Sequence, residues 1–148
     1  MGTLSQGLVG AWELVSFHVA LPDGSRAHPL GPDAEGYILY TADGFMSADL
    51  MQRGRAPYAS GDVQRGTPEE MTAAASGYVA YSGPYSVDEA ARTVHHHVRV
   101  SLFPNWLGDT QLRFARLDGD ALVLSSPPLL VSGTQAVPEL HWRRARRP

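Results

Sequence analysis

Three consecutive histidines, His95, His96 and His97, are the residues of this sequence best suited to chemistry. They lie in the stretch 93–106, TVHHHVRVSLFPNW, which otherwise alternates like a long β-strand. Imidazole titrates near neutral pH and can serve as a general acid or base. Successive side chains of a strand point to opposite faces, so His95 and His97 share one face. The face of His96 also carries Val94, Val98 and Val100. At least one imidazole is therefore expected in the interior.

Three tyrosines could line a ligand cavity. Tyr81 and Tyr85 share a face of one expected strand, and Tyr40 lies on another. A tyrosine that faces into a barrel offers an apolar ring and a hydroxyl that can donate to a carbonyl or enolate oxygen. A tyrosine on the outer face would only pack against a loop or helix, and the sequence leaves this alternative open for each of them.

Polar and aromatic side chains elsewhere complete the set of candidate ligand contacts. Ser47 and Asp49 share a strand face, and Asp49 could orient a histidine. Phe103, Asn105 and Trp106 follow the histidine strand and should lie at the rim of a barrel. There they could clamp a ligand or simply cap a turn, and loops at a rim often carry function.

A metal site is a further alternative, because His95 and His97 have a spacing that two imidazole ligands can use. A third ligand would have to come from another strand. The candidates are His18, Asp49, Glu139 and His141. Nothing in the local sequence selects one of them, so we expect no metal. Glycine-rich phosphate loops and a nucleophile elbow are missing from the sequence too, and we expect no cofactor.

Composition excludes several classes of function. The 148 residues contain neither cysteine nor lysine, which rules out disulfides, thiolate sites and lysine Schiff bases. A net charge of −3 argues against nucleic-acid binding, and we interpret the arginine-rich residues 143–147 as a solvated tail rather than a basic arm. The sequence shows no secretory signal and no apolar run long enough for a membrane span, so we expect a cytoplasmic protein. Whether it forms a homodimer stays open.

Short alternating segments separated by turn residues predict an all-β domain over residues 1–148. The expected strands are 11–19, 36–40, 45–51, 79–87, 93–102, 110–117, 121–126 and 139–144. Eight consecutive antiparallel strands without a βαβ unit are typical of an up-and-down barrel. A barrel of this size has room for one small ligand.

One short helix, over residues 68–76, is expected between two strands. Thr67 can cap it, Pro68 suits its first position, Glu70 completes a capping box, and Gly77 can end it. We expect this helix to cover a mouth of the barrel. The irregular segment 52–66 before it has the length of a lid or binding loop.

Several motifs resemble a known family. Gly10-x-Trp12 on the first strand, with Arg143 or Arg144 on the last, is similar to the lipocalin and calycin pattern, in which an arginine lies across the tryptophan at the closed end. The segments GYILYTADGFMSA, GTPEE, GYVAYSG, HHV and SLFPNW resemble, in this order, bacterial and fungal lipocalin-like domain proteins. The resemblance spans nearly the whole chain.

The resemblance implies a barrel with a ligand cavity, and some members of this family are linked to natural-product pathways. His95 falls where the family pattern often has another residue, which favours His96 and His97. We therefore expect a hydrophobic, oxygen-bearing small molecule as the partner, and a cofactor-free cyclisation or isomerisation. One histidine of the pair would move the proton and Tyr81 would stabilise the oxyanion. The alternative is a carrier or sequestering protein without catalysis.

Overall fold

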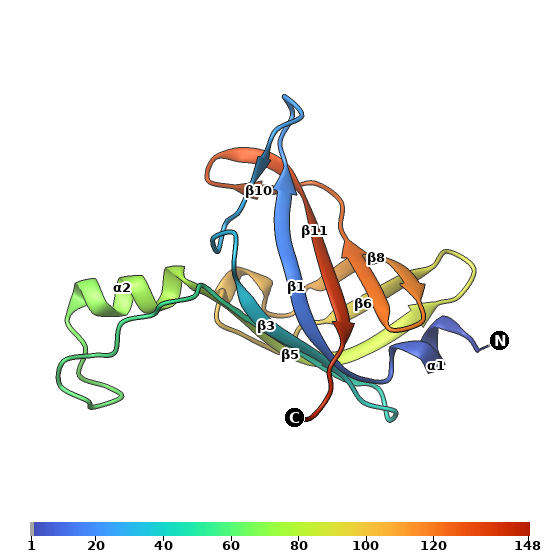
Figure 1. The fold of residues 1–148 in the computed structure, drawn as a ribbon, viewed down its shortest axis with the longest axis horizontal. Helices are drawn as coiled ribbons and strands as arrows, with labels where there is room; N and C mark the ends of the chain where they lie inside the picture. The colour runs from blue at the N-terminus through green and yellow to red at the C-terminus, as the bar shows by residue number, and fades with distance from the viewer. Residues whose placement is uncertain (1) are drawn as a thin grey trace.

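The computed structural model describes residues 2–148, which form an antiparallel β-barrel (Figure 1). Eight strands make up its wall in chain order: β1 (Gly10–Ala20), β3 (Glu35–Tyr40), β4 (Phe45–Met51), β5 (Tyr78–Asp88), β6 (Thr93–His97), β8 (Thr110–Asp118), β9 (Ala121–Ser125) and β11 (Thr134–Arg144). Three short strands pair at its ends: β2 (Arg26–Ala27), β7 (Val100–Ser101) and β10 (Leu129–Val131).

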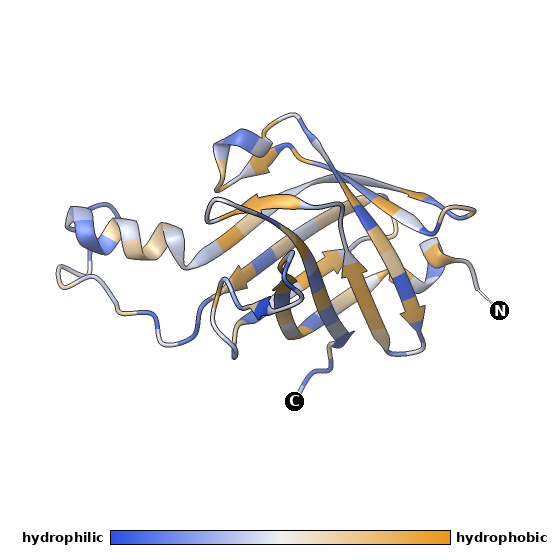
Figure 2. Ribbon diagram, turned by 90° about the horizontal axis from the view of Figure 1, so that it is seen from above, coloured by the Kyte–Doolittle hydropathy of each residue, from blue (hydrophilic) through white to orange (hydrophobic). Residues whose placement is uncertain are grey.

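The barrel closes because β11 pairs with both β9 and β1. The other wall strands each pair with their neighbours in the sequence, so the topology is up-and-down. Alternate residues of each strand point inward, and Figure 2 shows the apolar residues concentrated along these strands. The predicted eight-stranded barrel is confirmed.

A tryptophan and an arginine hold the closed end together. Helix α1 (Leu4–Leu8) lies across this end with Leu4 and Leu8 fully buried. Trp12 is buried and donates from Nε1 to the carbonyl of Leu8 at 2.9 Å. The guanidinium of Arg144 lies 4.0 Å from the ring of Trp12. It donates to the carbonyl of Gly7 in α1 and to that of Val9, just after the helix. Arg144, not Arg143, is therefore the arginine of the family pattern.

Helix α2 (Pro68–Ser76) begins and ends as predicted, with Thr67 and Glu70 forming the capping box. Its predicted position over a barrel mouth is wrong. Figures 1 and 2 show that α2 and segment 52–66 extend away from the barrel, and α2 buries none of its side chains. The segment packs on the helix instead, because the backbone of Ala59 binds Glu70 and Arg55 binds carbonyls at the end of α2. No helix within residues 2–148 is long and apolar enough to cross a lipid bilayer.

The predicted strand 93–102 is interrupted. β6 ends at His97, and β7 pairs with β5 only after a break at Val98 and Arg99. The break lies opposite Gly83, where an added Cβ would overlap the carbonyl oxygen of His97. One extra residue reverses the alternation, so Val98 is buried but Val100 is 60 % exposed, in contrast to the prediction.

The sequence did not predict the hairpin of β10 with the start of β11. Ser132 and Gly133 both have positive φ in its turn, which suits a two-residue hairpin. Pro138 falls within β11, although proline usually interrupts a strand. β11 therefore begins earlier than the predicted residue 139.

The contacts of Arg144 with Trp12 and α1 at the closed end predict that substituting Arg144 and Arg143 has different effects on stability. Arg144→Ala removes two charge-assisted hydrogen bonds and the contact with Trp12, so we expect the free energy of unfolding to fall by about 2–4 kcal/mol. Arg143 makes an exposed ion pair with Glu13, and Arg143→Ala should cost less than about 1 kcal/mol. Urea denaturation followed by tryptophan fluorescence measures both values. Equal losses in the free energy of unfolding for the two variants would contradict this stabilising role of Arg144.

Candidate functional site: a buried imidazole in the barrel cavity

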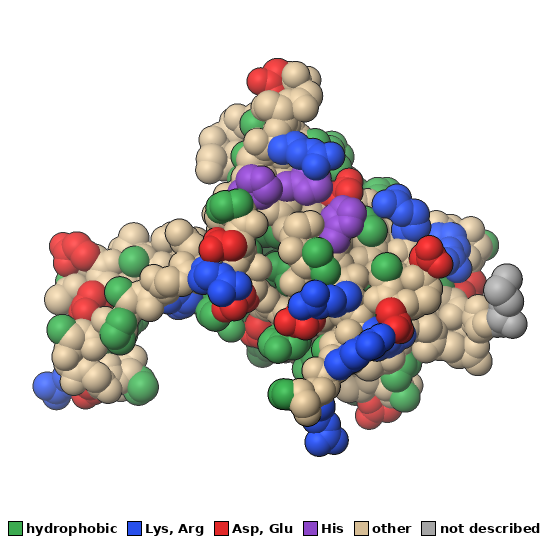
Figure 3. Space-filling view, viewed as in Figure 1, with side chains coloured by type: hydrophobic (Ala, Val, Ile, Leu, Met, Phe, Trp, Pro, Cys, Tyr) green, Lys and Arg blue, Asp and Glu red, His purple; other side chains and the backbone are tan. Residues whose placement is uncertain are grey.

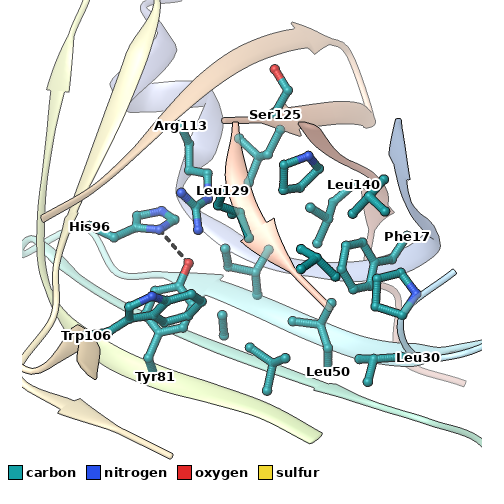
Figure 4. Close-up of a pocket in the computed structure, with 18 of the residues that line it drawn as sticks. Phe17, Leu30, Leu50, Tyr81, His96, Trp106, Arg113, Ser125, Leu129 and Leu140 are labelled. Carbon is teal, nitrogen blue, oxygen red and sulfur yellow. Dashed lines mark hydrogen bonds between the residues drawn. The ribbon is translucent and has the colours of Figure 1, made fainter. Parts of the chain in front are cut away.

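The barrel encloses a cavity of about 340 Å³ (Figure 4). Its walls are mainly apolar side chains from strands on all sides. They include Phe17, Leu30, Leu50, Leu124, Leu129 and Leu140. Polar groups are gathered at one end, where Figure 4 shows His96, Tyr81 and Arg113 close together. The cavity therefore has an apolar body and one polar end.

His96 is fully buried at this polar end and lies between two tyrosines. The hydroxyl of Tyr40 lies 2.7 Å from Nε2, and the hydroxyl of Tyr81 lies 2.8 Å from Nδ1. Burial lowers the pKa of His96 well below its ordinary value of 6.5, and the charge of Arg113 lowers it further. Burial also raises the pKa of Tyr40 well above 10.0. Both side chains are therefore neutral at neutral pH.

The proton positions in this network follow from the burial of Tyr40. Among the described residues, His96 is the sole hydrogen-bond partner of the Tyr40 hydroxyl, which is enclosed on all sides. A buried hydroxyl proton without an acceptor is costly, so Tyr40 donates to Nε2 of His96. A neutral imidazole then carries its proton on Nδ1 and donates it to Tyr81. The hydroxyl proton of Tyr81 is left free to point into the cavity.

Arg113 and Trp142 also face the cavity, and the sequence analysis missed both. Figure 4 shows the guanidinium of Arg113 pointing toward the hydroxyl of Tyr81. Both faces of β8 carry an arginine beside apolar residues, so alternation alone did not show whether Arg113 or Arg116 points inward. Trp142 is buried, and its Nε1 has no hydrogen-bond partner among residues 2–148.

Several predicted site residues do meet at the cavity. Tyr81, His96 and Trp106 line it, and the rings of Tyr81 and Trp106 pack edge to face at 5.3 Å between centroids. Tyr40 lies behind His96, outside the cavity wall. Tyr85 packs edge-on against Tyr40 at 4.9 Å, and its hydroxyl donates to a backbone carbonyl. Tyr40 and Tyr85 therefore support the site without lining it.

Other predicted site residues lie away from the cavity. His97 points to the outer face, where its ring bonds hydroxyls of neighbouring strands. Ser47 and Asp49 are also on the outer face, because Ala48 and Leu50 occupy the inner face of β4. Asn105, in the short 3₁₀ helix Pro104–Trp106, is exposed.

Phe103 is 51 % exposed and packs edge-on against Trp106, outside the cavity. Its ring centroid lies 5.5 Å from that of Trp106. Phe103 can therefore hold Trp106 in place at the rim, but it does not face His96.

The histidines on the outer face form two separate groups. The rings of His95 and His97 stack at 6.5 Å on β6. His18 and His141 stack at 6.1 Å on β1 and β11, and His141 contacts Glu139 at 2.7 Å. Figure 3 shows histidine side chains gathered on this second surface. Within residues 2–148, no three His, Asp or Glu side chains are arranged to hold a metal ion.

The hydrogen-bond network predicts a fixed protonation state for His96. We expect ¹⁵N NMR to show a protonated Nδ1 and a bare Nε2 that stay unchanged from about pH 8 to about pH 5, because burial lowers the pKa of this imidazole. His96→Gln identifies the resonances by removing them. A protonated Nε2, or formation of imidazolium near pH 6.5, would contradict the network.

Comparisons with known proteins agree with this fold. The 4′-hydroxy-3′-methoxypropiophenone carrier protein of Aspergillus oryzae is 38 % identical over 109 residues, which cover 69 % of this chain and 98 % of that protein. No solved structure matches the chain significantly. The family model described as lipocalin-like domain matches residues 9–145. The chain therefore belongs to the lipocalin-like domain family.

Proposed function

We propose that the protein binds a compact, oxygen-bearing aromatic molecule in its barrel and carries it without changing it. The cavity of about 340 Å³ is at the lower end of the ~300–1,000 Å³ typical of small-molecule sites. Its size supports a compact ligand, and its apolar walls support a largely hydrophobic one. The polar end at Tyr81 and Arg113 would receive an oxygen of the ligand.

The Aspergillus oryzae relative supports a carrier role. Its name describes a carrier of an aromatic ketone that bears a hydroxyl and a methoxy group. Such a molecule combines a flat ring with oxygens at its edges, which suits a cavity with apolar walls and one polar end. A similar phenyl ketone is therefore a reasonable first probe for this chain.

The closed hydrogen-bond network is the observation that carries the proposal. His96 has its lone pair engaged by Tyr40 and its proton engaged by Tyr81. Its lowered pKa opposes uptake of a proton, and the raised pKa of Tyr40 opposes loss of one. The network therefore supplies a fixed donor to a ligand rather than a group that exchanges protons at neutral pH, and this supports binding over catalysis.

Filling the cavity should abolish binding. Leu124 is 2 % exposed and lines the cavity, so Leu124→Trp should weaken binding of 4′-hydroxy-3′-methoxypropiophenone by about tenfold or more. Leu130 is 67 % exposed on β10, and Leu130→Trp makes the same change outside the cavity. Isothermal titration calorimetry measures both affinities, and thermal melting checks that both variants fold. Equal affinities for the two variants would refute binding in the barrel.

A cofactor-free cyclisation or isomerisation is the second candidate function. Tyr81 and Arg113 point toward the same space and could both donate to an enolate oxygen as its charge develops. This arrangement suits abstraction of a proton next to a carbonyl, provided that a base lies on the ligand or in solution. Trp106 at the rim would help to orient the reacting molecule.

Hydrogen–deuterium exchange separates a carrier from a catalyst. We expect the protein not to accelerate exchange of the protons next to the carbonyl of a bound phenyl ketone in D₂O, measured by mass spectrometry, because the His96 network has no free base. Acceleration that is lost in Tyr81→Phe and kept in Arg116→Gln would favour catalysis instead. Arg116 is exposed on the outer face of β8 and serves as the control position.

A further inference from the structure

The polar end of the cavity offers two hydrogen-bond donors to a ligand. The hydroxyl of Tyr81 points its proton into the cavity, because its oxygen already accepts from His96. Arg113 adds a guanidinium, which can only donate. One of its nitrogens, Nη1, donates to the carbonyl of Leu112 at 2.9 Å, and its other N–H groups remain for a ligand. A donor that loses water without gaining an acceptor is costly, so both groups favour a ligand that brings an acceptor.

The charge of Arg113 has no counter-ion in the cavity. The residues that line the cavity include no Asp or Glu, and Arg113 forms no ion pair with any residue of the described part of the chain. Removing a guanidinium from water beside apolar walls is costly unless an opposite charge compensates it. A bound anion would provide that compensation.

The remaining strands add no other ionisable group to this end. The titratable or charged side chains that face it are Tyr81 from β5, His96 from β6 and Arg113 from β8, with Tyr40 from β3 behind them. The described residues of β1, β4, β9 and β11 that line the cavity are apolar, apart from Trp142 and Ser125. Figure 4 shows the hydroxyl of Ser125 pointing away from Arg113.

We propose that the polar end of the cavity is an oxyanion receptor, which binds the conjugate base of an acidic phenol or enol in preference to the neutral molecule. Suitable ligands are phenols conjugated with a carbonyl group and enolised 1,3-dicarbonyl compounds. Their deprotonated oxygen would accept from Tyr81 and Arg113 together. This inference rests on the proposed binding function and adds the charge of the ligand.

Preference for the anion fixes the direction of the pH dependence. If the site binds the anion more tightly, the pKa of the ligand hydroxyl is lower in the complex than in water. Affinity then rises with pH from the bound pKa up to the free pKa and is constant above it. A shift of one pKa unit corresponds to a tenfold preference for the anion.

The test uses the full chain with 4′-hydroxypropiophenone and its non-ionisable analogue 4′-methoxypropiophenone. The phenolate absorbs at longer wavelength than the phenol, so a spectrophotometric pH titration reports the pKa of the bound hydroxyl directly. We expect that pKa to fall by about one unit or more on binding, which corresponds to about a tenfold preference for the anion. The methoxy analogue should bind with an affinity that does not follow the phenol's ionisation.

Matched variants assign the effect to Arg113. Arg113→Gln should abolish most of the shift, whereas Arg116→Gln, on the outer face of the same strand, should leave it intact. If Arg113→Gln does not fold, the wild-type titration decides the proposal by itself.

The outcomes separate this inference from the proposed function. Binding of both probes with an unchanged or raised phenol pKa would overturn the oxyanion receptor and leave the binding function standing. An equal shift in Arg113→Gln and Arg116→Gln would also overturn it. Binding of neither probe would contradict both the receptor and the proposed binding of compact aromatic molecules.

Discussion

Closure of the barrel between β1 and β11 is the constraint on which the rest of the structure depends. Once this seam forms, the inner faces of the wall strands are largely shielded from bulk water. A polar group enclosed there needs a hydrogen-bond partner, either from another residue inside the barrel or from a bound ligand. Tyr40, His96 and Tyr81 satisfy one another under this constraint, and the hydrogen-bond direction follows because Tyr40 has one acceptor within reach.

This buried network determines what the cavity can offer. His96, which the sequence suggested as a general acid or base, is neutral and hydrogen-bonded at both ring nitrogens. It positions Tyr81 and turns that hydroxyl toward the ligand space. Arg113, which has no ion-pair partner among the described residues, lies beside Tyr81, and the two donors make the polar end complementary to an oxygen acceptor. The network therefore acts on a ligand through Tyr81, and His96 is a positioning residue.

The outer face of the same strands carries side chains of similar type in a different setting. His95 and His97 alternate with His96 but lie in contact with hydroxyls at the surface. Ser47 and Asp49 alternate with the inward Ala48 and Leu50 in the same way. Helix α2 and the segment before it pack on each other beyond the barrel, and only Ser76 at the end of the helix lines the cavity.

The sequence by itself determined the strand succession and the bounds of α2, because period-two alternation and capping residues act over a few neighbours. The contact of Trp12 with an arginine of the last strand was expected from the family resemblance, and the structure assigned it to Arg144. The sequence also named Tyr81, His96 and Trp106, which line the cavity, but grouped them with Ser47, Asp49 and His97, which do not.

Only the tertiary structure decided which faces of β1 and β8 point inward, since both faces of these strands carry mixed side chains and local alternation is symmetric between them. Closure of the barrel broke that symmetry. It placed Arg113 beside the buried imidazole and Trp142 in the cavity wall, on strands far apart in the chain.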